Sequence, residues 1–272
     1  GVAAALGVPT VGVLAPRDDV GTAAADAFAD AATAAGLAVT ARGTYDPTAS
    51  DLEPDLKEFL GLDPATNPRL AAHLRRHGRR GLASFSPDVP FALLYIPDRY
   101  DRAALVASYL PYFNVEVRSE EFLDPDYLRR KHGGRIPQVV QLLGSSGWNH
   151  PSLPARGGDA VEGAYFVEPC PGPLGVAAAD ALYAAFVERT GRDPSSAAQE
   201  AHDAWILASR ARAVAAAAPA AVPVRDAFVA ALRAARLDDG ACTPASVGAD
   251  GQLVRAPALL GVDAGEIVAV PY

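Results

Sequence analysis

The stretch Phe91–Phe113, FALLYIPDRYDRAALVASYLPYF, constrains the fold more than any other part of this 272-residue chain. It opens with the apolar run Phe91–Ile96, and short runs rich in aromatic and branched side chains are typical of strands buried on both faces of a parallel sheet. Pro97 ends the strand because it has no N–H for the ladder, and Asp98 is a good N-cap for the helix that follows. The stretch therefore predicts a strand, a polar turn and a helix. In open α/β sheets, ligands bind at such turns, beyond the carboxyl ends of the strands.

The composition narrows the classes of partner. The formal net charge of −8 at pH 7 argues against nucleic acid, which requires a basic face. No apolar run reaches the roughly 18 residues of a membrane-spanning helix. The two cysteines, Cys170 and Cys242, leave three possibilities open: one disulfide, a pair of buried thiols, or two unrelated residues. Because the chain begins at Gly1 and contains no methionine, we expect a mature chain, a trimmed chain or an internal fragment.

Strands and helices alternate over the first 170 residues, which indicates βαβ units and a parallel sheet. The predicted strands are Val11–Leu14, Leu37–Ala41, Phe91–Ile96, Gln138–Leu143 and Ala164–Val167. The predicted helices are Thr22–Ala35, Leu52–Leu60, Arg69–Arg80, the segment from Asp98 to Phe113, and Pro125–Lys131. The charged stretch Glu120–Arg135 is expected to be a surface insertion and a solvated face, with a partner-docking surface as the functional alternative.

The later part of the chain has a different pattern. Three helices are predicted, at Leu174–Thr190, Ser196–Ala218 and Val224–Leu237. A tail from Cys242 to Tyr272 follows, with short β-like runs around turns.

Several sequence motifs together resemble one protein family. The pattern VGVLAPRDDVG–helix–AAGLAVTARGTYDPTASDL resembles the second lobe of type I periplasmic binding proteins. FALLYIPDRYDRAAL, QLLGSSGWNHPSL and GGDAVEGAYFVEP resemble its branch of penicillin-binding protein activators and amino-acid ABC-transporter binding proteins. GRDPSSAAQEAHDAWILA resembles the return helices of the same family. The resemblance covers most of the chain, with five motifs in the expected order.

This resemblance implies an α/β fold with a flavodoxin-like, three-layer parallel-sheet lobe. Residues 1–168 correspond to ligand-binding lobe two, residues 169–240 to a helical remainder of lobe one, and residues 241–272 to a β-rich tail returning across the hinge. In the family, lobe one begins with several βα units before the strand that starts here at residue 11. We therefore expect a C-terminal fragment, with a naturally shortened protein as the alternative.

The resemblance also implies a function. We expect a non-catalytic, extracytoplasmic ligand-binding domain in the periplasm or cell envelope, of the penicillin-binding-protein-activator type or a solute-binding lipoprotein. Two lobes would close about a hinge near Glu168–Pro173. The expected partner is a small molecule, for which an amino acid is one candidate, or a cell-wall synthase. We expect no cofactor, and contact with the membrane only through a lipid anchor outside this chain. The alternative is the substrate-binding component of a branched-chain type amino-acid ABC transporter.

Three turns would line the ligand cleft of such a lobe. Their candidate ligand-binding residues are Asp19, Val20, Asp98, Tyr100, Ser145, Ser146 and Trp148. In the amino-acid binders, the corresponding turns supply an aromatic ring and an acid for the ligand's ammonium. Here Val20 stands where those binders often have tyrosine, and two serines stand where an acid can occur. Only Asp98 retains a carboxylate that suits a cation through charge-assisted hydrogen bonds.

Two of these residues have simpler interpretations. Asp98 could be only a helix cap, and Trp148 could be only a large apolar side chain packed under its loop.

Catalysis and metal binding are weaker interpretations. Ser145 and Ser146 lie near His150 in sequence, but G-S-S-G is not the G-x-S-x-G pattern of a nucleophile elbow. A serine hydrolase therefore stays a distant alternative, and we predict no catalytic residues. His73 and His77 have the i, i+4 spacing of a shared metal. No glutamate lies between them, so a solvated basic face is favoured and no metal site is predicted.

Overall fold

The computed structural model describes residues 7–118, 124–174, 176–177, 179–219 and 221–271. Contacts divide the chain into two compact units, each described here by itself. Unit 1 comprises residues 1–166 and 261–267, and unit 2 comprises residues 167–260 and 268–272.

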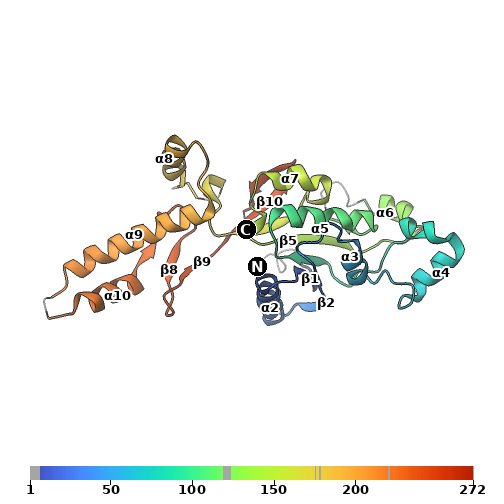
Figure 1. The fold of residues 1–272 in the computed structure, drawn as a ribbon, viewed down its shortest axis with the longest axis horizontal. Helices are drawn as coiled ribbons and strands as arrows, with labels where there is room; N and C mark the ends of the chain where they lie inside the picture. The colour runs from blue at the N-terminus through green and yellow to red at the C-terminus, as the bar shows by residue number, and fades with distance from the viewer. Residues whose placement is uncertain (1–6, 119–123, 175, 178, 220, 272) are drawn as a thin grey trace. The chain divides into compact units, whose positions relative to one another are not determined.

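The main sheet runs in the order β11-β10-β6-β5-β3-β1-β2, with the two-residue strand β4 also paired to β5. The pairs β1–β2, β1–β3, β3–β5 and β5–β6 are parallel. The predicted parallel α/β sheet is therefore confirmed. The five strands predicted from the sequence are β1, β2, β3, β5 and β6. When these five are numbered in chain order, they lie in the flavodoxin-like order 2-1-3-4-5. The strands are β1 (Thr10–Pro16), β2 (Ala38–Tyr45), β3 (Leu93–Ile96), β4 (Glu116–Val117), β5 (Val139–Gly144), β6 (Tyr165–Glu168), β10 (Ala258–Asp263) and β11 (Glu266–Ala269) (Figure 1).

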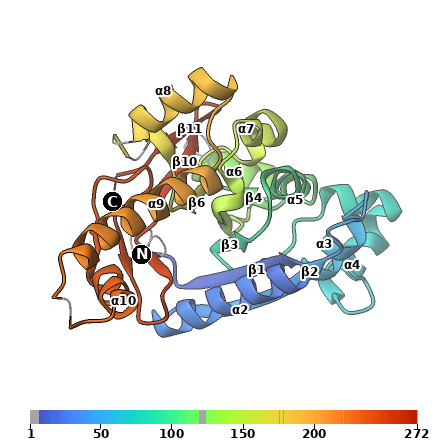
Figure 2. The same ribbon diagram turned by 60° about the vertical axis from the view of Figure 1, so that its left-hand side comes forward.

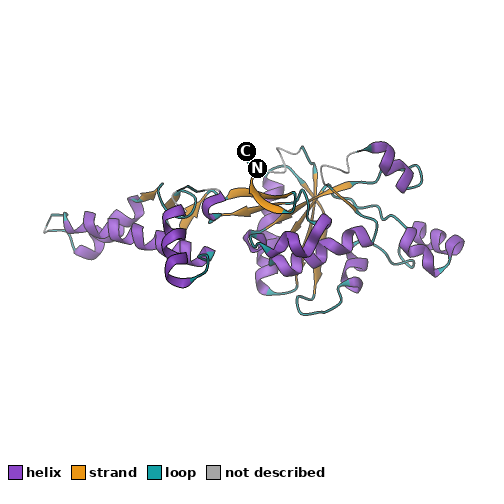
Figure 3. Ribbon diagram, turned by 90° about the horizontal axis from the view of Figure 1, so that it is seen from above, coloured by secondary structure: helices purple, strands orange, loops and turns teal. Residues whose placement is uncertain are grey.

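Helices cover both faces of the sheet in unit 1 (Figure 3). Helix α2 lies alongside β1 and β2 (Figure 2), and its first turn is capped by the Asp18 carboxylate, which accepts the N–H of Gly21 at 2.7 Å. On the other face, α5 packs against α7. The helices are α2 (Asp19–Ala34), α3 (Glu53–Phe59), α4 (Pro68–His77), α5 (Tyr100–Tyr112), α6 (Pro125–Lys131) and α7 (Ser152–Gly157), with 3-10 turns η1 (Arg79–Ser84), η3 (Ser146–Trp148) and η4 (Gly158–Ala160).

Some predicted boundaries are wrong for identifiable reasons. The strand predicted at Phe91–Ile96 begins only at Leu93, and the Phe91 ring instead packs over Gly12, where a Cβ would lie 2.7 Å from it. The helix predicted at Arg69–Arg80 ends at His77, because Gly78 adopts φ +68° and stops it. The helix at Pro125–Lys131 has the predicted bounds. Part of the predicted insertion, residues 120–123, lies outside the described residues.

The described residues of unit 2 form three helices and a small antiparallel sheet. The helices are α8 (Ala179–Thr190), α9 (Ser196–Ala216) and α10 (Val224–Ala234), preceded by a 3-10 turn, η5 (Gly172–Leu174). The sheet is β7 (Arg236–Leu237), β8 (Ala245–Val247) and β9 (Leu253–Arg255). Leu207, Leu237 and Ala245 form a buried cluster between α9 and this sheet. The helix predicted to reach Leu237 therefore ends earlier, because its last residues form a strand.

A disulfide joins Cys170 and Cys242 in unit 2, across 72 residues of sequence. This selects one of the three possibilities that the sequence left open. Both sulfur-bearing residues are buried, so the bond belongs to the core of the unit.

Beside the disulfide, a buried carboxylate holds the same turn. Asp203 of α9 accepts the backbone N–H of Ala241 at 2.6 Å and that of Cys242 at 3.1 Å. Its Oδ2 also accepts the guanidinium of Arg255 at 2.8 Å, and the side chains of Asp203 and Arg255 are almost completely enclosed. The Nδ1 of His202 lies 3.4 Å from Asp203 Oδ1. Among the described residues, no helix is long and apolar enough to cross a membrane.

Candidate functional site

Four turns meet at the carboxyl edge of the parallel strands in unit 1. The sheet order β5-β3-β1-β2 places the ends of these strands side by side. The turns after β1, β3 and β5 carry all of the predicted site residues. The turn after β2 contains no predicted site residue, although ligands bind at this edge of an open sheet.

The Asp98 carboxylate is the central group of this edge. Its Oδ2 accepts the hydroxyl of Tyr45 at 2.6 Å, and its Oδ1 accepts the N–H of Arg99 at 2.6 Å. Helix α5 begins at Tyr100 with Arg99 as its N-cap, and the Arg99 side chain makes no capping bond. The interpretation of Asp98 as the helix cap is therefore wrong. Its carboxylate instead joins the ends of β2 and β3, and each oxygen keeps a lone pair for a further donor.

Tyr45 is the site residue that the sequence analysis missed. It is completely buried at the end of β2, and burial together with its hydrogen bond to Asp98 raises the pKa of its phenol far above the ordinary value. The available signal was the Tyr-Asp-Pro turn that follows the second strand. The predicted strand ended at Ala41, however, so Tyr45 was not placed at a strand end.

Replacing Tyr45 with phenylalanine is expected to lower the free energy of unfolding by about 1 kcal/mol at neutral pH, because one hydrogen bond is lost and the ring packing is kept. A phenol whose pKa is raised on folding contributes stability below its unfolded pKa of about 10, and this contribution is lost as the pH rises above that value. The variant should therefore lose less stability than the wild type between about pH 9 and pH 11. Denaturant unfolding at several pH values measures both effects, and parallel curves for the two proteins would contradict the prediction.

Tyr100 and His150 form a stacked pair beside Asp98. Their ring centroids lie 3.7 Å apart with an interplanar angle of 6°. The Nδ1 of His150 accepts the N–H of Ser152, the first residue of α7, at 3.1 Å. Among the described residues, no hydrogen bond joins His150 to Ser145 or Ser146. The stack therefore forms a flat wall, and the geometry of a serine nucleophile with its base is not present in the described part.

Trp148 lies beneath its loop. The indole is fully buried, and its Nε1–H donates to the Ile96 carbonyl at 3.0 Å. Gly144 makes room for it, because a Cβ there would lie 2.2 Å from the ring. This geometry favours the packing interpretation of Trp148. The residue supports the loop that carries Ser145 and Ser146, of which Ser146 is exposed and Ser145 is half-buried.

The turn after β1 is open to solvent. Asp19 is exposed and Val20 is 77% exposed, whereas Gly21 is buried against Pro16. A Cβ on Gly21 would lie 2.3 Å from the Pro16 carbonyl oxygen, so only glycine fits the close approach of α2 to β1. The structure thus brings Asp98, Tyr100 and the serine loop together, and leaves Asp19 and Val20 exposed on the neighbouring turn.

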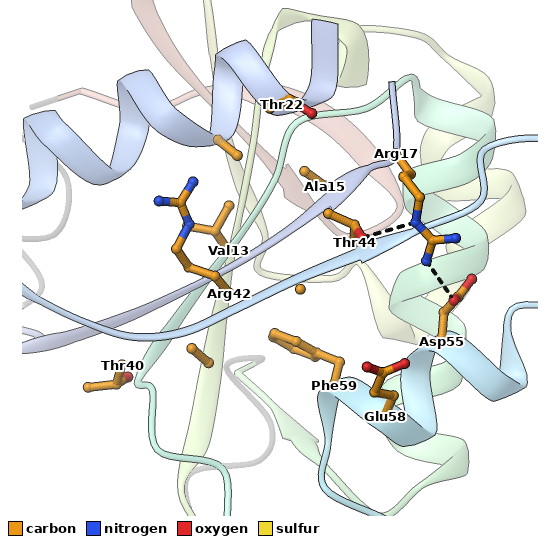
Figure 4. Close-up of a pocket in the computed structure, with 13 residues that line it drawn as sticks. Val13, Ala15, Arg17, Thr22, Thr40, Arg42, Thr44, Asp55, Glu58 and Phe59 are labelled. Atoms are coloured by element: carbon orange, nitrogen blue, oxygen red, sulfur yellow. Dashed lines mark hydrogen bonds and ion pairs between the residues drawn. The ribbon is translucent and has the colours of Figure 1, made fainter. Parts of the chain in front are cut away.

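A cavity of about 620 Å³ surrounds part of the outer edge of β2 (Figure 4). Arg17 donates from Nε to Thr44 Oγ1 at 3.2 Å and from Nη2 to Asp55 Oδ1 at 3.1 Å, and Arg42 is paired with Asp26. Both guanidinium groups in the lining are therefore already paired with carboxylates. The cavity was not predicted, because its lining comes from β1, α2, β2, α3 and the turn after β1, without a common motif. The lining residues are Val13, Ala15, Arg17, Thr22, Ala25, Thr40, Ala41, Arg42, Gly43, Thr44, Asp55, Glu58 and Phe59.

His73 and His77 lie one turn apart on α4, at the spacing considered for a metal site. The rings of His73 and His77 lie 4.5 Å apart, and His73 Nε2 is 3.0 Å from the Gly81 carbonyl oxygen. Among the described residues, no group of three His, Cys, Asp or Glu side chains could hold a metal ion.

A family comparison identifies the class of protein. Residues 130–266, about half of the chain, match the family model described as periplasmic binding protein. The chain therefore belongs to the periplasmic binding protein family. No curated protein sequence matches the chain.

Solved structures share the fold. A Rhodospirillum rubrum protein, provisionally described as a branched-chain amino acid ABC transporter, has a TM-score of 0.68 and 18% identity over 99% of this chain and 62% of its own. The leucine-binding protein LivK from Thermotoga maritima MSB8 has a TM-score of 0.59 and 18% identity, over 99% of this chain and 62% of its own. A solute-binding protein of an ABC transporter from R. palustris, solved with benzoate, has a TM-score of 0.58 and 17% identity, over 99% of this chain and 59% of its own. The chain thus has the type I periplasmic binding fold and spans about 60% of the length of these structures.

Proposed function

We propose that this chain is the ligand-binding part of an exported, non-catalytic solute-binding protein, whose ligand carries an ammonium group. The observation that carries the proposal is the Asp98 carboxylate, which is half-buried at the carboxyl edge of the sheet and oriented by Tyr45. A carboxylate held in place by a buried phenol accepts a cationic donor without having to reorient. The neighbouring Tyr100–His150 stack offers a flat wall for an aliphatic or aromatic side chain.

An amino acid is the ligand class that this arrangement fits best. One related structure is a branched-chain amino acid transporter binding protein from Streptococcus pneumoniae, in complex with isoleucine. We therefore favour the substrate-binding component of an amino-acid ABC transporter. The second candidate is a regulatory protein of the penicillin-binding-protein-activator type, because Val20, Ser145 and Ser146 depart from the amino-acid binders at three positions.

The mechanism we propose is hinge closure. The chain passes from one compact unit to the other after Phe166, after Leu260 and after Ile267, within β6, β10 and β11. Three crossings confine relative motion to a few backbone positions, as in hinge-type closure around a ligand. The expected hinge near Glu168–Pro173 begins two residues after the first crossing.

We assign unit 1 to lobe two and unit 2 to a helical remainder of lobe one. Large apolar side chains on α9 and α10 are exposed, including Trp205 at 72%, Val214 at 63% and Val224 at 76%. Exposed apolar side chains of this size on two helices are consistent with packing against further protein. The greater length of the structures with this fold is consistent with such a partner segment in the whole protein.

The disulfide supports an exported location. Bonds between cysteines persist in oxidising compartments and are rare in reducing ones. The Cys170–Cys242 bond is therefore consistent with the periplasm or cell envelope. A lipid anchor outside this chain belongs to the same proposal.

Replacing Asp98 with asparagine is expected to weaken binding of an amino-acid ligand about tenfold to hundredfold, because a charge-assisted hydrogen bond to the ammonium is replaced by a neutral one. Titration calorimetry of the full-length protein with a panel of amino acids measures the effect. The matched control is Asp30→Asn, which removes the same charge from an exposed position on α2. Unchanged affinity in Asp98→Asn would refute the role of Asp98. No heat with any amino acid would instead favour the regulatory candidate.

A further inference from the structure

Residues 69–80 have an unusual charge. This segment, RLAAHLRRHGRR, contains five arginines and no acid, in a protein whose formal net charge is −8. It forms α4 and the start of η1, and is called here the arginine segment. Such a concentration of one sign on a protein of the opposite net charge creates a local positive potential.

The charges at the end of the arginine segment are not neutralised by neighbours. Arg75, Arg76 and Arg80 are exposed, and among the described residues no carboxylate lies within ion-pair distance of them. Arg69, at the start of the segment, differs because it pairs with Asp88 at 3.0 Å. The three exposed guanidinium groups therefore remain available to an external anion.

The segment is held firmly on unit 1. The Asn114 side chain donates to the carbonyl oxygens of Ala83 and Phe85, both at 3.0 Å, and so fastens η1 to the end of α5. The Arg69 guanidinium lies 4.4 Å from the centre of the Phe85 ring. The exposed arginines are thus presented on a fixed scaffold.

The arginine segment and Asp98 lie towards opposite ends of the parallel strands. The arginine segment precedes β3, so it lies towards the amino ends of the parallel strands, whereas Asp98 lies at the carboxyl ends. A second basic run, RRKHGGR at residues 129–135, precedes β5 in the same way. Arg135 of this run shares Asp88 with Arg69, and Figure 1 shows α4 and α6 at the same end of unit 1.

The surface chemistry distinguishes between kinds of anionic partner. In the described part of residues 68–84, no large apolar side chain is exposed. A specific protein interface would need a buried apolar centre around its charges. Long, solvated arginines without an apolar centre suit a planar, diffuse array of negative charge, which is the surface of an anionic bilayer.

We propose that the arginine segment docks this protein on an anionic lipid surface by electrostatic attraction, with the ligand edge of unit 1 turned away from the lipid. The proposal does not depend on the identity of the ligand bound at Asp98. Each arginine near an anionic surface raises the partition coefficient about fivefold. Three free arginines therefore account for about a hundredfold.

The test is cosedimentation of the full chain with vesicles of phosphatidylcholine that do or do not contain phosphatidylglycerol. The wild type should bind only the anionic vesicles, and should be released at about 1 M salt, where the Debye length falls to about 3 Å. The variant Arg75→Gln/Arg76→Gln/Arg80→Gln should bind about a hundredfold more weakly. These positions are exposed, so thermal unfolding of the variant should match the wild type and exclude a folding defect.

The matched control is Arg212→Gln/Arg225→Gln/Arg233→Gln, which removes three exposed arginines from unit 2 and changes the net charge equally. This control should bind anionic vesicles as the wild type does. Equal loss in both variants would show that only net charge matters and would overturn the proposal. Wild-type binding to polyglutamate but not to vesicles would overturn it in favour of an acidic protein partner.

Discussion

Replacing Asp203 with alanine is expected to lower the free energy of unfolding of unit 2 by about 3–5 kcal/mol, the usual cost of removing one partner of a buried ion pair. The Asp203 carboxylate is fully enclosed and bonded to Arg255 and to the N–H groups of Ala241 and Cys242. Its removal leaves the nearly buried Arg255 charge with the Thr243 carbonyl as its remaining acceptor. It also removes the acceptor of two buried N–H groups. Gly240 shows how closely the turn fits, because a Cβ there would lie 2.5 Å from the carboxylate.

Hydrogen exchange in the native protein can localise this effect. The amides of Ala241 and Cys242 should lose most of their protection, whereas the amides of β1 and β3 in unit 1 should keep theirs. The control is Asp239→Ala, which breaks the bidentate but solvent-exposed pair with Arg210. Exposed pairs contribute little, so this variant should be close to the wild type. Similar protection in Asp203→Ala and Asp239→Ala would refute the structural role of Asp203.

The sequence could have suggested Asp203, although it could not have explained it. Its helix has a buried stripe at every fourth residue, namely Gln199, Asp203, Leu207, Ala211 and Ala215. Helical periodicity identifies such a stripe only when polar residues are accepted as members of it. A buried carboxylate needs a partner, and Arg255, the partner of Asp203, lies 52 residues further along the chain. Local patterns carry no information about a contact of that range.

The strands show the same limit from the opposite side. The buried strand β3 was predicted because a continuous apolar run is a local signal. The edge strand β2 was predicted four residues too short, because its residues alternate between exposed and partly buried positions and include Arg42 and Gly43. This error placed Tyr45 in a turn, and its hydrogen bond to Asp98 was therefore not predicted.

The turn at Asp98 illustrates what a local signal can predict at a candidate ligand-binding edge. A proline and an aspartate after an apolar run located the carboxylate at the end of a strand. Its orientation depends on Tyr45, which lies two strands away in the sheet order β3-β1-β2. The position of a site residue is therefore predictable from its own strand, whereas its chemical environment depends on how the strands are ordered.

Removing the disulfide in the double variant Cys170→Ser/Cys242→Ser is expected to lower the free energy of unfolding of unit 2 by about 4 kcal/mol, from the chain entropy of a loop of this size. The bond closes 72 residues, which contain α8, α9 and α10. Without it, the unfolded chain gains many conformations that the bond excludes. The folded turn should survive at moderate temperature, because Asp203 still accepts the N–H of Ala241 and the substitution leaves the backbone N–H at position 242 in place.

Denaturant unfolding with and without reductant measures this contribution. Reductant should lower the unfolding midpoint of the wild type and leave that of the double variant unchanged, since the buried bond becomes accessible only on unfolding. An equal midpoint for the oxidised wild type and the double variant would contradict the prediction. Asp203 and the disulfide restrain the same turn, so their effects should not add in a triple variant. A turn already freed by the loss of Asp203 gives the disulfide less native structure to preserve, and the measured coupling between them would show how far the two restraints replace each other.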